Sequence, residues 1–136
     1  MLMSCARILR TMVKYATIEF FQQLADALNA DPNFQAKAGS VKATLLFSTK
    51  ERAEACLMKV EQGKVNVTEV PRESPADFTF WTDYATWITN HRDNVPLEKL
   101  IMTGKVKFKG SLPKIMMLKS QLNIIDDTQR KIPAEY

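Results

Sequence analysis

The chain has 136 residues, a length that suits one domain with a hydrophobic core of its own. Its composition is 46% hydrophobic and 25% charged, with 4 Gly and 6 Pro, which excludes collagen-like, low-complexity and disordered classes. One His, two distant cysteines and the lack of CxxC or HExxH motifs predict no metal site. We expect Cys5 and Cys56 to be reduced and inert, which favours a cytoplasmic location.

The net charge is only +4, but the positive charges are unevenly distributed. Residues 99–125 contain six lysines and no acidic residue, and residues 1–14 form a second basic stretch. Such a patch suits anionic lipid headgroups, nucleic acid or an acidic partner, although a solvated surface is the plainer interpretation. For residues 1–14 we expect a poorly ordered extension or an extra helix, with a weak targeting or anchor segment as the alternative.

The first predicted element is an amphipathic helix over residues 16–30. Its apolar residues recur at helical spacing, at Ile18, Phe21, Leu24, Ala25 and Leu28. Asp31-Pro32-Asn33 is expected to end the helix, because proline cannot continue it and Asn and Asp favour turns. Residues 36–42 carry no decisive pattern.

Four strands are expected next, over residues 43–48, 53–60, 64–70 and 77–81. Gln62-Gly63 is a turn signal, and the first connections are too short for parallel crossovers, so the pattern predicts an antiparallel meander. In the fourth strand, Phe78 and Phe80 share one side.

Two short helices follow the strands. Thr82 or Asp83 caps the first, which carries Trp87, and Pro96 begins the second, which Gly104 ends. A strand over residues 105–109 then alternates lysines with inward apolar residues, and a closing helix covers about 112–125, before a polar tail that we expect to fray. This order predicts an α+β fold rather than repeating βαβ units.

No motif indicates catalysis or cofactor binding. GxGxxG, P-loop and GxSxG patterns are missing from the sequence. His91 lies in a polar stretch and is expected to be a solvated loop residue, and Asp126-Asp127 a solvated helix end. We therefore expect a protein that is not an enzyme and uses no cofactor.

Aromatic residues near lysines also suggest stacking on single-stranded nucleic acid. Against that interpretation, Trp87 shares a helix face with Tyr84 and Ile88, a stripe expected to be buried. The lysines of residues 105–109 alternate with core residues rather than with exposed aromatics. We therefore expect no nucleic-acid partner.

The closing helix is unusually rich in flexible apolar side chains. Met116, Met117 and Ile124 widen the stripe formed by Leu112, Ile115, Leu118, Leu122 and Ile125. Methionine suits a surface that adapts to a variable apolar ligand, although simple packing on the sheet explains each residue singly.

Residues 76–80, Ala-Asp-Phe-Thr-Phe, precede a short helix, Pro96 and the sequence Leu-Ile-Met-Thr-Gly-Lys-Val-Lys-Phe-Lys-Gly at 100–110. A helix containing Met116-Met117-Leu118-Lys119 follows. In this order and spacing the chain resembles the sterol carrier protein type-two domain family. The resemblance implies a five-stranded, largely antiparallel sheet covered on one face by helices and enclosing an apolar tunnel. The tunnel would accept a fatty acid, acyl-CoA, phospholipid or sterol or isoprenoid, with a lining of Phe78, Phe80, Trp87, Ile101, Met102, Val106, Phe108, Ile115, Met116, Leu118 and Leu122.

We therefore expect a lipid-binding domain over 15–126, a basic extension over 1–14 and a tail over 127–136. Pro113, in the first turn of the closing helix, could alter the tunnel mouth, and the last three residues are no peroxisomal address. The predicted function is non-catalytic lipid binding and transfer, with an accessory module that docks a partner protein of lipid or isoprenoid metabolism as the alternative. Transient contact with an anionic membrane is expected through Lys105, Lys107, Lys109 and Lys114; the oligomeric state is not specified.

Overall fold

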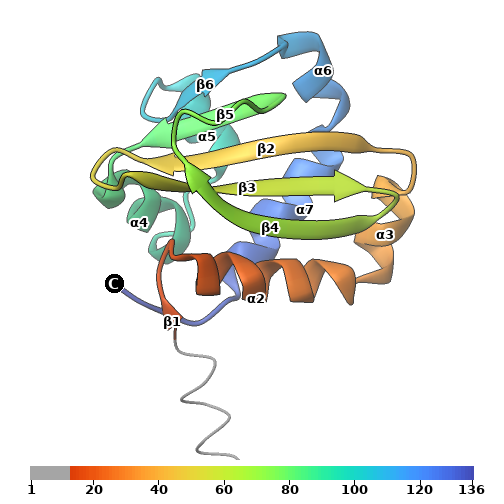
Figure 1. Cartoon of the computed structure of the whole chain (residues 1–136), viewed down its shortest axis with the longest axis horizontal. Helices are drawn as coiled ribbons and strands as arrows, with labels where there is room; N and C mark the ends of the chain where they lie inside the picture. Colours follow the sequence, from red (N-terminus) through yellow and green to blue (C-terminus); the bar gives the residue numbers. More distant parts are fainter. Residues whose placement is uncertain (1–12) are drawn as a thin grey trace, which may run out of the picture.

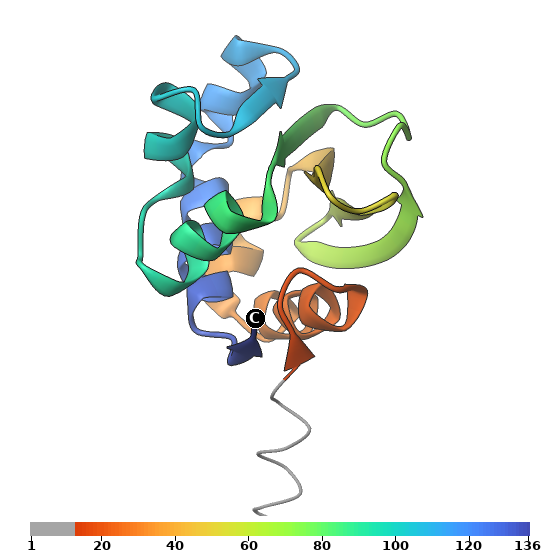
Figure 2. The same ribbon diagram turned by 90° about the vertical axis from the view of Figure 1, so that its left-hand side faces the viewer.

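A five-stranded sheet and a layer of helices on one of its faces make up residues 13–136, the part of the chain that this computed structural model describes (Figure 1, Figure 2). The strand order is β4-β3-β2-β5-β6. The β2/β5 pair is parallel and the other three pairs are antiparallel, which confirms the predicted α+β class with a largely antiparallel sheet. The strands are β2 (Lys42–Thr49), β3 (Glu54–Glu61), β4 (Lys64–Pro71), β5 (Phe78–Thr82) and β6 (Lys107–Lys109).

The connection from β4 to β5 crosses the sheet on the face opposite the helices and places β5 beside β2 (Figure 1). Asp77 fixes the end of this connection to β2. The Asp77 amide donates to Thr44 Oγ1 at 2.8 Å, and the Thr44 amide donates to Asp77 Oδ2 at 3.0 Å. At its start, Arg72 Nη1 donates to the Lys50 carbonyl at 3.1 Å. This crossing makes possible the parallel pairing of β5 with β2, the one parallel pair in the five-stranded sheet.

The first helix is α2 (Ile18–Asn29), whose N-terminus is capped by the side chain of Thr17. The prediction that Asp31-Pro32-Asn33 simply ends the helix was incomplete, because a second helix, α3 (Pro32–Ala38), begins there. Asp31 is its N-cap and accepts from the Asn33 amide at 2.9 Å. Proline is tolerated at the first helical position, where its missing N–H has no helical partner.

The two short helices are confirmed as α4 (Tyr84–Arg92) and α5 (Leu97–Met102), with Asp83 capping α4 and Gly104 at φ +76° after α5. The prediction that His91 is a solvated loop residue was wrong. It lies in the last turn of α4 and is 7% exposed. Its Nε2 donates to the Ile132 carbonyl at 2.8 Å, and its Nδ1 accepts from the Tyr136 hydroxyl.

The closing helix is two helices, α6 (Leu112–Met117) and α7 (Lys119–Arg130), divided at Leu118. The expectation of a solvated, frayed end from Asp126 was wrong, because Asp126 and Gln129 are both buried. They share the inner face of α7 with Ile125, since positions three and four apart lie on one side of a helix. The chain then returns as β7 (Ala134–Glu135), parallel to β1 (Val13–Lys14). Expectations for residues 1–12, Cys5 included, lie outside the described residues.

The core lies between the sheet and the helices. A row of aromatic contacts links α2 to the far strand, with ring centroids 5.7 Å apart for Phe21–Phe47, 5.3 Å for Phe47–Phe80 and 5.4 Å for Phe80–Phe108. Such pairs contribute about 0.5–1.5 kcal/mol each beyond area burial. Among residues 13–136, none of the helices is both long and apolar enough to cross a bilayer.

Candidate functional site

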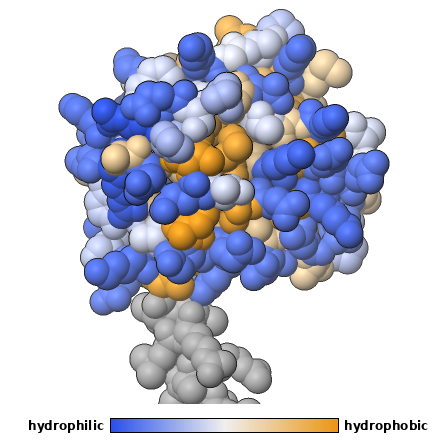
Figure 3. All heavy atoms as spheres, viewed as in Figure 1, coloured by the Kyte–Doolittle hydropathy of each residue, from blue (hydrophilic) through white to orange (hydrophobic). Residues whose placement is uncertain are grey.

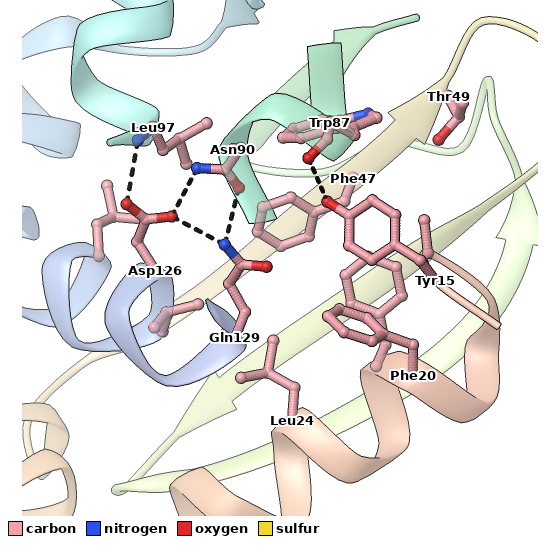
Figure 4. Close-up of a pocket in the computed structure, with 14 residues that line it drawn as sticks. Tyr15, Phe20, Leu24, Phe47, Thr49, Trp87, Asn90, Leu97, Asp126 and Gln129 are labelled. Carbon is pink, nitrogen blue, oxygen red and sulfur yellow. Dashed lines mark hydrogen bonds between the residues drawn. The ribbon is translucent and has the colours of Figure 1, made fainter. Parts of the chain in front are cut away.

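An apolar pocket, called here the interior pocket, lies between α2, β2, α4 and α7 (Figure 4). Its volume is about 40 Å³, far below the roughly 300–1,000 Å³ of ordinary ligand pockets. A lipid chain therefore requires the surrounding helices to move apart. The lining residues are Tyr15, Ala16, Phe20, Phe21, Leu24, Phe47, Thr49, Trp87, Asn90, Leu97, Leu122, Ile125, Asp126 and Gln129.

A second pocket, the surface pocket, lies between α5, α6 and α7 and has a volume of about 190 Å³. It shares Leu97, Leu122 and Asp126 with the interior pocket, so these three side chains form the boundary between the two spaces. The remaining lining residues are Glu98, Ile101, Met102, Leu112, Ile115, Met116, Lys119 and Asn123.

One end of the interior pocket is polar. Asp126 Oδ1 accepts from Asn90 Nδ2 at 3.0 Å and from Gln129 Nε2 at 3.3 Å (Figure 4). Asp126 Oδ2 accepts from the Leu97 amide and from Arg130 Nη1, each at 3.0 Å. The buried carboxylate thus joins α4, α5 and α7, and every buried charge needs such partners.

Tyr15 closes another side of the interior pocket. Its hydroxyl donates to the Trp87 carbonyl at 2.7 Å, and its ring meets Phe20 edge-on at a centroid distance of 5.0 Å. Burial is the main cause that raises the pKa of Tyr15 above its ordinary value, so the phenol stays neutral. Among residues 13–136, no group of three or more His, Cys, Asp or Glu side chains is arranged to hold a metal ion.

The sequence matches a family model described as the SCP-2 sterol transfer family over residues 21–123, most of the chain. The chain belongs to the SCP-2 sterol transfer family. The SCP-2 resemblance expected from residues 76–122 is thereby confirmed, and with it lipid and sterol binding in the general sense that defines the family.

Solved structures share the SCP-2 fold at low sequence identity. A crystal structure of sterol carrier protein 2 has a TM-score of 0.75 and 17% identity over 88% of this chain and 99% of that chain. The solution structure of the conserved protein TT1886 from Thermus thermophilus has a TM-score of 0.75 and 17% identity over 90% and 92%. UbiJ-SCP2, a ubiquinone synthesis protein, has a TM-score of 0.56 and 15% identity over 78% and 87%. Among curated protein sequences, none matches.

The SCP-2 domain divides the eleven residues predicted to line a tunnel among several places. Trp87 and Leu122 line the interior pocket. Four others line the surface pocket together with Leu122, namely Ile101, Met102, Ile115 and Met116. The remaining five are distributed through the core, with Phe78, Phe80 and Val106 buried, Phe108 half-buried, and Leu118 beside a small space under α7. Their part in ligand binding stays a prediction.

The prediction missed much of the lining. Phe21 and Leu24 of α2 were recognised as an apolar helix face, but nothing local said that this face borders a pocket. Asn90, Asp126 and Gln129 were missed because polar residues near predicted element ends resemble solvated ones. Their burial depends on packing between α4 and α7, which only the tertiary structure shows.

The lysines of residues 99–125, which were expected to form one basic surface, lie in two different places. Lys105 and Lys107 line a groove of about 660 Å³ on the sheet face that the helices leave uncovered, together with Trp81. Lys119 instead borders the surface pocket, where its Nζ lies 3.3 Å from Glu98 Oε1. Lys114 lies in α6 beside exposed methionines. Only part of the basic stretch therefore accompanies the surface pocket.

Proposed function

We propose that this SCP-2 domain reversibly binds one lipid, without chemical change to it, in the apolar space between the sheet and helices α2, α4, α5, α6 and α7. The ligand classes are those of a fatty acid, acyl-CoA, phospholipid, or sterol or isoprenoid. The observation that carries the proposal is the shared boundary of the two pockets. Displacement of Leu97 and Leu122 would join them into one elongated cavity.

The energetics favour a long apolar ligand. Burying one methylene contributes about 0.8 kcal/mol, so about ten buried methylenes match the free energy of a micromolar dissociation constant. Some of that gain offsets the opening of the pockets. Helix α6 is well suited to move, because Leu112, Met116 and Met117 are 62%, 72% and 81% exposed and hold few core contacts.

The exposed end of the domain supports a membrane-docking role in loading. Met102, Leu112, Met116 and Met117 expose apolar side chains around the surface pocket, and Lys109 and Lys114 lie beside them in the chain. Figure 3 shows pale-orange, moderately hydrophobic residues at the surface where Figure 1 places α6, and a deeper orange patch over the middle of the sheet. Apolar insertion and lysine attraction act together at anionic membranes. A cytoplasmic setting is part of this proposal, and the buried, unpaired Cys56 is compatible with it.

Uptake of a fluorescent fatty acid by Met116→Arg and Met117→Arg variants tests the pocket. Both methionines are exposed, so both variants are expected to fold, but only Met116 lines the surface pocket. Met116→Arg is expected to lower affinity about tenfold or more, because the charged head must be desolvated beside the ligand. Met117→Arg, the matched control, is expected to retain uptake of the fatty acid from solution, because Met117 does not line the pocket. Equal uptake by both variants and the unchanged protein would remove α6 from the site.

The second candidate is an accessory module that docks a partner protein through the same exposed cluster of Met102, Leu112, Met116 and Met117. The cluster contains most of the large exposed apolar residues of the described chain. Similarity to a ubiquinone synthesis protein makes isoprenoid metabolism a reasonable setting. Native mass spectrometry of gently purified protein separates the candidates. A stoichiometric lipid supports the binding role, whereas an empty protein that takes up no lipid supports docking.

A further inference from the structure

The polar end of the interior pocket has a fixed hydrogen-bond polarity. The Asp126 carboxylate forms an ion pair with Arg130 Nη1 at 3.0 Å, and a carboxylate only accepts hydrogen bonds. The side-chain amides of Asn90 and Gln129 must therefore turn their NH₂ groups toward it. The reverse orientation would place carbonyl oxygen against carboxylate oxygen.

Every amide hydrogen at this end is already used. Asn90 Nδ2 donates to the Val95 carbonyl at 2.8 Å and to Asp126 Oδ1 at 3.0 Å. Gln129 Nε2 donates to Asn90 Oδ1 at 2.8 Å and to Asp126 Oδ1 at 3.3 Å. An NH₂ group has two hydrogens, so neither amide has one left for a ligand.

What remains for a ligand is an acceptor. The side-chain carbonyl of Gln129 points away from Asp126 toward the space beside Tyr15 and Phe20 (Figure 4). The other donors of the lining are also engaged, since the Tyr15 hydroxyl donates to the Trp87 carbonyl and Trp87 Nε1 donates to the Ser48 carbonyl. The Thr49 hydroxyl can donate or accept, but it lies beyond Tyr15, away from Gln129 (Figure 4).

Among residues 13–136, the charges at this end leave no cation for an anionic ligand. Arg130 already forms ion pairs with the buried Asp126 and with the exposed Asp127. A fatty-acid carboxylate placed here would meet a carbonyl acceptor backed by a carboxylate, in a poorly solvated space that strengthens the repulsion. A ligand hydroxyl or amide N–H would instead donate a hydrogen bond to the free side-chain carbonyl of Gln129.

We infer that Gln129 makes the interior pocket selective for a neutral lipid whose polar end donates a hydrogen bond, such as a long-chain alcohol or a sterol, over an ionised fatty acid. The inference rests on the proposed lipid binding and adds the orientation of the ligand. The hydroxyl end enters beside Gln129, and the apolar chain extends past Leu97 and Leu122 toward the surface pocket.

Three ligands with the same 16-carbon chain test this selectivity: hexadecan-1-ol, hexadecanoic acid and methyl hexadecanoate. Their affinities are measured by displacement of diphenylhexatriene from the full chain at pH 7.4. The alcohol is expected to bind about tenfold more tightly than the ester, which cannot donate, because one hydrogen bond contributes about that factor. The acid is expected to bind at least about tenfold more weakly than the alcohol.

Gln129→Met removes the acceptor at similar length, and Gln121→Met makes the same change on the same helix outside the interior pocket. The first variant is expected to lose the preference for the alcohol over the ester, and the second to keep it. An acid that binds the unchanged protein as tightly as the alcohol would overturn the inference, as would a Gln129→Met variant that keeps the preference. If all three ligands bind with equal affinity, the inferred selectivity is wrong but the proposed lipid binding stands. Failure of diphenylhexatriene and all three ligands to bind defeats the proposed function itself.

Discussion

At the scale of single residues, several polar side chains that the sequence suggests are exposed to solvent are in fact buried. His91, Asp126 and Gln129 each look solvent-facing by local pattern, yet each is buried. Each has partners that come from distant parts of the chain, such as Ile132 for His91 and the Leu97 amide for Asp126. Buried polar groups need such partners, so these residues specify how α4, α5 and α7 pack.

The neutral state of His91 gives the first prediction at this scale. Desolvation is the main cause that lowers its pKa below the ordinary value of 6.5, although hydrogen bonding to the Ile132 carbonyl opposes the shift. The unfolded chain therefore binds this proton at a higher pH than the folded chain does. The free energy of unfolding should be unaffected by His91 above about pH 6.5 and should fall as the pH drops below it, toward the folded pKa.

Urea unfolding of the unchanged protein and of His91→Gln between pH 7.5 and 5 measures this contribution. Glutamine retains a donor toward Ile132 but does not titrate in this range. The variant is expected to lose less stability on acidification than the unchanged protein, since all other groups titrate alike in both. Parallel pH profiles for the two proteins would contradict the assignment.

At the scale of elements, the caps and breaks decide where helices begin. The predicted α2, α4 and α5 and all five strands of the sheet are confirmed, because each carries a local apolar period bounded by a turn or cap residue. Helix α3 was missed because proline after Asp31 was taken as a stop, although the same pair serves as N-cap and first residue. The division at Leu118 and the extension of α7 to Arg130 depend on burial of Asp126 and Gln129, which local pattern does not report.

The N-cap of α3 gives a prediction at this scale. Asp31→Ala removes the side chain that accepts from the amides of Asn33 and Phe34. The expected loss is about 1 kcal/mol in the free energy of unfolding, measured by urea denaturation. Asp127→Ala, at an exposed position within α7, is the control and should change stability less. An unaltered midpoint for Asp31→Ala would show that the proline alone fixes the start of α3.

At the scale of the whole molecule, the surface pocket lies under α5 and α6, the part of the helical layer with the most exposed apolar side chains, and it borders the interior pocket. The sheet and α2 form the fixed wall, held by long strands and the aromatic row from Phe21 to Phe108. The candidate site could be predicted on the movable side, where Met116 and Ile115 stand out in the sequence. The pocket residues on the sheet and α2 were not predicted, because the sequence does not distinguish a pocket-lining strand residue such as Phe47 from an ordinary core residue.

Membrane attachment gives the prediction that belongs to the whole molecule. Cosedimentation with vesicles should increase with their content of anionic phospholipid and decrease with salt, because exposed charges are screened beyond about 8–10 Å. The double variant Lys109→Gln, Lys114→Gln is expected to bind such vesicles about tenfold or more weakly, as each lysine contributes about 1 kcal/mol near the surface. The control is Lys50→Gln, Lys131→Gln, whose lysines lie outside residues 102–117, the segment that carries the exposed methionines. An equal loss of vesicle binding in both double variants would show that only the net charge of the protein matters, not the position of the lysines.

Strand β6 has a consequence for self-association. It ends the sheet with only three residues, two of which are lysines, and its outer side presents unpaired backbone groups. An exposed edge is a template on which a second chain can add a strand, and shortness and lysine charge both oppose such growth. The lysines of β6 therefore protect the sheet from fibre-like aggregation. Replacing Lys107 and Lys109 with β-branched apolar residues would remove that protection without touching the interior or the surface pocket.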